Sequence, residues 1–130
     1  YFERRTEGEQ LKAAMKTPRI VLGLLADQNA GDHGLWLPVF GRETSVSPAP
    51  AVFAQRYRCR VFTSACFRTS PGRWTIELGE EIPVRENGKR RSTEAITRDI
   101  IAAQEETILR DPANWFWVHN RWKPRPQAHE

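Results

Sequence analysis

The sequence predicts an α/β domain with a central, mostly parallel sheet flanked by helices. The first observation behind this is the alternation of helix-type and strand-type segments along the chain. The second is the segment 19–26, Arg-Ile-Val-Leu-Gly-Leu-Leu-Ala, which is apolar almost throughout. A strand that lacks polar alternation is expected where helices cover both faces of a sheet. With 130 residues, the chain is long enough for one compact domain and too short for two, so residues 1–130 are expected to form a single domain.

In the first half of the chain, helix formers predict a helix over Glu7–Lys16, which Pro18 ends. The buried strand over 19–26 follows. Asp27–Ser47 then reads as a loop rich in Gly and Pro that carries bulky apolar residues. Loops of that length inside a compact domain usually have a function. A second helix is predicted over Pro48–Tyr57, with a proline near its first turn.

The second half is predicted to contain a β-hairpin and a long helix. The hairpin joins strands at Arg60–Arg68 and Trp74–Leu78 through a turn at Ser70-Pro71-Gly72. A charged loop follows, with a tight turn at Asn87-Gly88. The long helix runs through Arg110 and is capped by Ser92 or Thr93. Pro112 is expected to open a last short helix that carries the aromatic residues, and a polar tail follows Lys123.

Charge and composition favour an acidic partner but do not select one. Twenty basic residues against sixteen acidic ones give a net charge of +4. Such an excess suits lipid phosphates, acidic carrier proteins or nucleic acid, and an ordinary basic surface explains it equally well. The longest apolar stretch, Ile20–Ala26, has the length of a strand and not of a membrane span. No signal peptide is recognisable at the N-terminus, and an anchor before residue 1 is left open.

The two cysteines and the histidines suggest neither a disulfide nor a metal centre. Cys59 and Cys66 are seven residues apart in one predicted strand, so their side chains point to opposite faces. Zinc-type spacing is absent. We therefore expect reduced thiols in a cytosolic setting, no metal and no cofactor.

Two short signatures carry the functional information. The first is Leu25-Ala26-Asp27-Gln28-Asn29-Ala30-Gly31, which runs on to Leu37-Pro38-Val39-Phe40-Gly41, and the second is Pro112-Ala113-Asn114-Trp115-Phe116-Trp117-Val118-His119-Asn120-Arg121-Trp122-Lys123. Together, in this order, they resemble the C-terminal half of the bacterial lipid A biosynthesis acyltransferases, the lauroyl and myristoyl transferases. The resemblance covers about Leu11 to Pro126.

This resemblance implies a fold, a reaction and a location. The fold is the α/β domain of the glycerolipid acyltransferases, with residues 1–130 as its C-terminal half. The reaction transfers a fatty acyl chain from acyl carrier protein to a hydroxyl of a lipid A precursor in lipopolysaccharide biosynthesis. The implied location is the cytoplasmic face of the bacterial inner membrane, with the membrane surface as a further partner.

The family's catalytic dyad, a His followed by four residues and then Asp or Glu, is missing from this sequence. The residue at the acidic position is Pro38 after His33 and Pro124 after His119, and His129 lies one residue from the end. In the family the His is the general base on the acceptor hydroxyl, and the acid holds its tautomer. We therefore expect the dyad to lie upstream or to be lost, and this chain alone to be inactive.

Asp27 and Gln28 are the candidates for supporting catalysis. They follow the carboxyl end of the predicted strand, where ligands gather in open α/β sheets, and they match the family's Asp-Gln. The alternative is an Asp that caps nearby amides. Trp36 and Phe40 are candidates for lining an acyl chain, because each buried methylene contributes ~0.8 kcal/mol. They can equally well fill the core beneath the loop.

Three polar residues of the second signature, His119, Arg121 and Lys123, are the candidates for binding the acceptor. Amphipathic Trp with nearby cations suits a membrane interface or a phosphorylated headgroup. Arg121 can bind phosphate in bidentate fashion, and Lys123 acts as a point charge. The alternative is that the Trp residues pack in the core and the cations are solvated. The basic run Lys89-Arg90-Arg91 reads as a solvated loop, with a docking patch for phosphate or a carrier protein as the alternative.

Two other functions compete with lipid A acylation. One keeps the acyltransferase fold and changes the acceptor to another glycolipid or a phospholipid, which these residues do not distinguish. The other is a non-catalytic basic module that binds nucleic acid or anionic lipid. Five Trp among many Arg can stack bases. However, the Trp residues gather at the C-terminus instead of alternating with cations, and no RNA-binding sheet motif is present. Nucleic acid is therefore not the expected partner.

Overall fold

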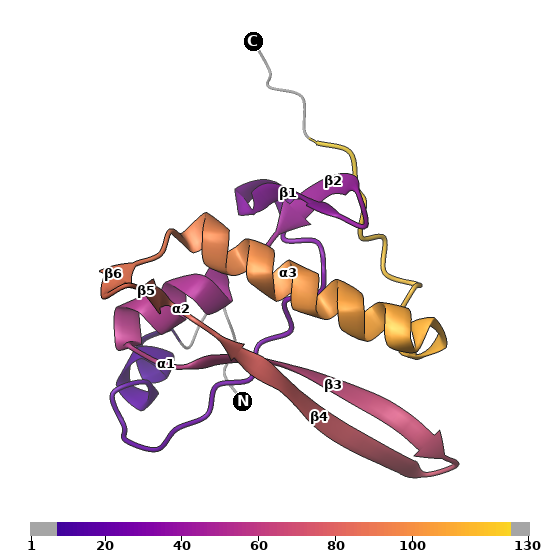
Figure 1. The fold of residues 1–130 in the computed structure, drawn as a ribbon, viewed down its shortest axis with the longest axis horizontal. Helices are drawn as coiled ribbons and strands as arrows, with labels where there is room; N and C mark the ends of the chain where they lie inside the picture. The colour runs from indigo at the N-terminus through magenta and orange to yellow at the C-terminus, as the bar shows by residue number, and fades with distance from the viewer. Residues whose placement is uncertain (1–7, 126–130) are drawn as a thin grey trace.

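A long helix organises the molecule. The computed structural model describes residues 8–125, and its longest helix, α3 (Thr93–Arg110), lies across the middle of the fold (Figure 1). Ser92 caps this helix as predicted, because its hydroxyl accepts a hydrogen bond from the Ala95 N–H at 3.0 Å. Buried apolar residues at helical spacing lie on different sides of α3, so the helix packs against two separate layers.

One layer is a hairpin formed by β1 (Leu35–Val39) and β2 (Arg42–Val46), which lies above α3 in Figure 1. Its turn is Phe40-Gly41, and both residues have positive φ, 49° and 72°. This two-residue turn matches the twist of the strands. Leu37, Val39 and Val46 pack on Ile101 of α3.

The other layer lies on the opposite side of α3 and contains α2 (Ala49–Tyr57) and a second, longer hairpin. That hairpin joins β3 (Val61–Ser70) to β4 (Arg73–Ile82). Ala51, Ile82, Ile96 and Ile100 form its core with α3. The short strands β5 (Arg85–Glu86) and β6 (Lys89–Arg90) follow, around the predicted Asn87-Gly88 turn.

The predicted central parallel sheet is not present in residues 8–125. The sheets there are three antiparallel pairs, β1–β2, β3–β4 and β5–β6. The mixture of helices and strands agrees with the prediction, but the arrangement of the strands does not. Parallel strands need a neighbour brought by a crossover connection, and each pair here is formed by a local turn.

The apolar segment 19–26 is irregular and largely exposed, so the prediction of a buried strand is wrong for this chain. Val21 is 93% exposed and Leu25 is 87% exposed. Within the described residues, no backbone–backbone hydrogen bond involves 19–28. A strand forms only beside another strand, and no strand of residues 8–125 is paired with this segment. Ala26, at its end, is buried.

The β3–β4 hairpin leaves one face uncovered. Its inner face contacts α3, where Glu77 pairs with Arg110 at 2.6 Å. On the outer face, Ile76 and Leu78 are 72% and 73% exposed, next to Trp74. A two-stranded hairpin is only marginally stable by itself, so α3 is its main support.

The other predicted elements agree in part with the structure. The first helix is α1 (Gly8–Ala14), and Glu7, its predicted start, lies outside the described residues. The second helix and the hairpin are confirmed, the hairpin with longer strands. The predicted loop Asp27–Ser47 is wrong in part, because it contains a 3₁₀ turn, η1 (Gly31–His33), and the β1–β2 hairpin. Between Pro112 and Arg125, the last described residue, only η2 (Pro112–Asn114) is helical, so the predicted aromatic helix is wrong and Trp115–Lys123 takes an irregular path.

Candidate functional site

The two sequence signatures lie against each other in the structure. The segment after Ala26 contacts the segment after Asn114, about ninety positions later, and the buried end of β2 lies beside both. We call this contact region the motif junction. Its members are Asp27, Gln28, Asn29, Thr44, Ser45, Trp115, His119 and Arg121.

Arg121 is the most buried member of the junction, with 2% of its surface exposed. One terminal nitrogen of its guanidinium donates to the carbonyls of Gln28 and Ser45, each at 2.7 Å. The Ser45 carbonyl also accepts from the Ala30 N–H at 3.1 Å, so Arg121 adds a second bond there and a side-chain partner at Gln28. Arg121 therefore connects the first signature to β2 from inside the molecule. The predicted role of Arg121 in binding a headgroup requires its side chain to lie on the surface, and the structure places it in the interior.

Asn29 joins the same three segments. Its backbone N–H donates to Nε2 of His119 at 3.0 Å, and its side-chain amide donates to the Arg121 carbonyl at 2.9 Å. The amide also donates to the Thr44 hydroxyl at 3.2 Å. Because Nε2 of His119 accepts a hydrogen bond, the proton of the neutral ring is on Nδ1. His119 therefore positions the loop and does not present a free Nε2 as a base.

Asp27 lies half-buried at the edge of the junction, where its Oδ2 accepts a hydrogen bond from the indole Nε1–H of Trp115 at 3.1 Å. Trp115 is the centre of an aromatic cluster. Its ring centroid lies 4.6 Å from that of Trp117, 6.2 Å from that of Trp122 and 6.3 Å from that of Phe40. The contacts with Trp117 and Trp122 are edge-on, an arrangement that aromatic pairs favour, so Asp27 lies next to a packed aromatic cluster.

Charge inside the junction is balanced between Arg121 and Asp27. Burial lowers the pKa of Arg121, and the negative charge of Asp27 opposes that change. An Arg keeps its proton at any physiological pH, so the buried site contains a permanent cation. Asp27 thus lies near enough to this cation to influence it, without an ion pair between them in the described residues, and its Oδ2 is held by the indole donor.

The other predicted site residues lie around the junction. Phe40 belongs to the aromatic cluster, and its backbone N–H donates to Glu105 of α3. Trp36 is half-buried on β1, with the guanidinium of Arg125 5.3 Å from its ring centroid. The Gln28 side chain and Lys123 are exposed. The structure thus brings Asp27, Gln28, His119 and Arg121 together and leaves Trp36 and Lys123 at the periphery.

Three members of the motif junction, Asn29, Thr44 and Ser45, were missed by the sequence reasoning. Asn29 belongs to the first signature, and its polarity after Asp-Gln was a usable signal. Thr44 and Ser45 are fully buried although they are polar. The apolar alternation of Leu35, Leu37 and Val39 before Phe40-Gly41 is the signal that predicts the hairpin which carries them.

Within the described part of the chain, residues 8–125, no group of three or more His, Cys, Asp or Glu side chains is placed to hold a metal ion. The helices of that same part include none that is long and apolar enough to cross a membrane. Both cysteines are free thiols, half-buried at Cys59 and exposed at Cys66.

Comparison with known proteins identifies one family. The model of a family described as "Bacterial lipid A biosynthesis acyltransferase" matches residues 3–124. This range includes the whole motif junction. Among curated proteins, no sequence matches the chain.

Proposed function

The chain belongs to the bacterial lipid A biosynthesis acyltransferase family, and on that premise we propose that it serves transfer of a fatty acyl chain to a lipid A precursor. The proposed donor is the thioester of acyl carrier protein. The acceptor is a hydroxyl of the precursor, which is esterified during lipopolysaccharide biosynthesis. The observation that carries the proposal is the motif junction, because it joins the two family signatures into one site.

The proposed reaction needs one base and no covalent enzyme intermediate. A His takes the proton of the acceptor hydroxyl, the oxygen attacks the thioester carbonyl, and the carrier thiol leaves with a proton. The acid of a His-x4-Asp/Glu dyad holds the imidazole. No His in this sequence has that spacing, so we propose that the dyad comes from a preceding part of an acyltransferase domain of which residues 1–130 are the C-terminal portion.

Two exposed apolar surfaces support a domain that is completed by more protein. The segment 19–26 has the composition of a buried strand and is exposed, with unpaired backbone groups among the described residues. The outer face of the β3–β4 hairpin exposes Trp74, Ile76 and Leu78. Large contiguous apolar surfaces usually mark interaction sites. Pairing of 19–26 with a neighbouring strand would place Asp27 at the carboxyl end of that strand.

In the completed site, Asp27 and Gln28 support the dyad. Oδ1 of Asp27 has no hydrogen-bond partner among residues 8–125 and is the group suited to orient an imidazole, since Oδ2 is already bonded to Trp115. The apolar rings of Phe40 and Trp36 are proposed to lie along the acyl chain. His119 and Arg121 shape the acceptor pocket from within, and Lys123, which is exposed, is the residue proposed to reach the headgroup.

The proposed location is the cytoplasmic face of the inner membrane, where the donor and the acceptor meet. An aromatic tip supports contact with a bilayer. Beyond α3, Phe116, Trp117 and Val118 are exposed by 63%, 52% and 85%. Aromatic residues at such a tip suit the membrane interface.

The test is transfer of labelled acyl chains from acyl carrier protein to a lipid A precursor. We expect transfer by a protein that includes the preceding coding region with its dyad, and background only from residues 1–130. Transfer by residues 1–130 alone would contradict the upstream dyad. If the longer protein acylates another glycolipid or a phospholipid and does not acylate lipid A precursors, it is an acyltransferase of this family with a different acceptor.

A further inference from the structure

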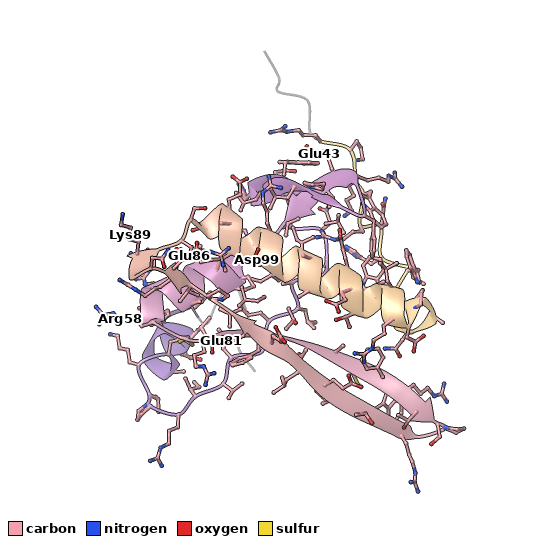
Figure 2. All side chains as sticks on the ribbon, viewed as in Figure 1. Glu43, Arg58, Glu81, Glu86, Lys89 and Asp99 are labelled. Carbon is pink, nitrogen blue, oxygen red and sulfur yellow. The ribbon has the colours of Figure 1, made fainter. Side chains whose placement is uncertain are left out.

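Positive charge is concentrated on one edge of the molecule, away from the motif junction. The edge is formed by α1, α2 and the β5–β6 turn, which lie together on the left of Figure 1. We call it the cationic face and define it by Lys12, Lys16, Arg56, Arg58, Lys89 and Arg90. All six are exposed. Figure 2 shows Arg58 and Lys89 on the outer side of this edge.

The cationic face is poor in carboxylates. The elements that form it, α1, α2 and the β5–β6 turn, contain two acidic residues, Glu9 and Glu86, so six cations stand against two acids there, whereas the whole chain has an excess of four positive charges. The remainder of the molecule is therefore close to neutral. Lys12 pairs with Glu9, and within residues 8–125 Lys16, Arg56, Arg58 and Lys89 form no ion pair.

Two of the three elements that form the face, α2 and the β5–β6 turn, are joined by a hydrogen bond. Arg90 of β6 donates to the Gln55 carbonyl of α2 at 3.2 Å, which ties the turn to the helix. Between α1 and α2 lies a cleft of about 450 Å³, lined by Glu9, Lys12, Lys16, Arg56 and Tyr57. The cleft gives the face a concave centre whose lining holds three cations and one acid, so its net charge is positive and its shape accepts a convex acidic surface.

Two other classes of partner fit the face less well. Nucleic acid binding uses aromatic rings that stack on bases. The ring on this face, Tyr57, is already stacked on Phe53 at 5.8 Å and covered by Arg56. A bilayer partner favours cations together with inserting apolar residues, and the aromatic tip at Phe116–Val118 lies beyond the far end of α3.

We infer that the cationic face docks a protein partner through an acidic surface on that partner. This rests on the proposed function, in which the acidic partner is the acyl carrier protein that delivers the acyl chain. Docking through complementary charge increases the association rate and selects the partner, and it weakens as salt rises. The basic run Lys89-Arg90-Arg91 contributes two of its cations to the face, while Arg91 is held by Asp99 at 2.7 Å.

The test is binding of fluorescently labelled acyl carrier protein to residues 1–130, measured by anisotropy at low and physiological salt. The variant is Lys16→Glu with Arg56→Glu. The matched control is Arg68→Glu with Arg73→Glu, which changes the net charge equally on the exposed end of the β3–β4 hairpin. We expect binding at low salt to weaken by about tenfold or more in the variant and by less than about threefold in the control.

Equal weakening in both double variants, or in neither, would overturn the inference. The inference would also be overturned by a second pair of results: the carrier does not bind, and the wild type binds vesicles of anionic phospholipid whereas the variant does not. A Glu-rich helical peptide separates this inference from the proposed function. If the peptide binds at the face and the carrier does not, the acidic docking face stands and the proposed donor fails. If the longer enzyme transfers acyl chains with an unchanged KM for the carrier in the variant, the function stands and the docking face fails.

Discussion

Arg121→Gln is expected to destabilise the fold strongly, although the sequence placed this residue in headgroup binding. Arg121 is 2% exposed, and its guanidinium donates to the carbonyls of Gln28 and Ser45 at 2.7 Å. Each hydrogen bond from a charged donor contributes about 1.5–3 kcal/mol. Removing the charge also removes its desolvation cost, which offsets part of that loss. The expected net loss is about 3 kcal/mol in the free energy of unfolding.

The assay is urea and thermal unfolding of residues 1–130, followed by Trp fluorescence, because Trp115 lies in the same junction. For a chain of this length, about 3 kcal/mol corresponds to a Tm lower by roughly 12 °C. Arg121→Lys keeps the charge but not the planar fork, so about half of that loss is expected. The matched control is Lys123→Gln, an exposed change with an expected effect within about 0.5 kcal/mol.

A stability of Arg121→Gln within about 0.5 kcal/mol of the wild type would refute this reasoning. Arg121 would then not be the connection between the first signature and β2. In that case the original assignment to an anionic headgroup would be the better account, and vesicle binding of the variant would decide it.

Three further outcomes are expected. Asp27→Asn in the full-length enzyme should lower turnover by at least ~10-fold, or about 1.4 kcal/mol, with an unchanged circular dichroism spectrum; normal turnover would remove Asp27 from the site. Ser92→Ala should lower the free energy of unfolding by about 1 kcal/mol, because the Ala95 N–H loses its cap, and an unchanged urea midpoint would contradict this. Lys123→Gln should weaken binding of the intact protein to anionic vesicles by about 1 kcal/mol, less at high salt; equal binding at low salt would exclude it from lipid contact.

Local signals in the sequence were sufficient for the three α-helices, for the β3–β4 hairpin and for the turn between β5 and β6. Ser92 predicted the start of α3, the Ser-Pro-Gly stretch predicted the β3–β4 turn, and Asn87-Gly88 predicted the β5–β6 turn. Each of these depends on residues within a few positions of one another, so no distant part of the chain had to be known.

The failures have a different physical origin. The segment 19–26 has the composition of a buried strand, but a strand forms only with a partner, and the described residues provide none. The β1–β2 hairpin was not predicted because its turn has Phe at the first position, and Phe rarely adopts a positive φ.

The candidate site was predicted in its members and not in its geometry. The resemblance selected Asp27, Gln28, His119 and Arg121, and the structure brings all four into one junction. It could not show that Arg121 points inward. That orientation is set by the two carbonyls it pairs, which belong to segments far apart in the sequence.

The central claim is that the two signatures form one joined site, and a double-mutant cycle between Asp27 and Trp115 tests it most directly. Asp27→Ala removes the acceptor and Trp115→Phe removes the indole donor while keeping most of the ring. We predict a coupling of about 1 kcal/mol in the free energy of unfolding of residues 1–130, since the two groups share one hydrogen bond at the edge of the buried junction. Additive effects within about 0.3 kcal/mol would contradict the junction.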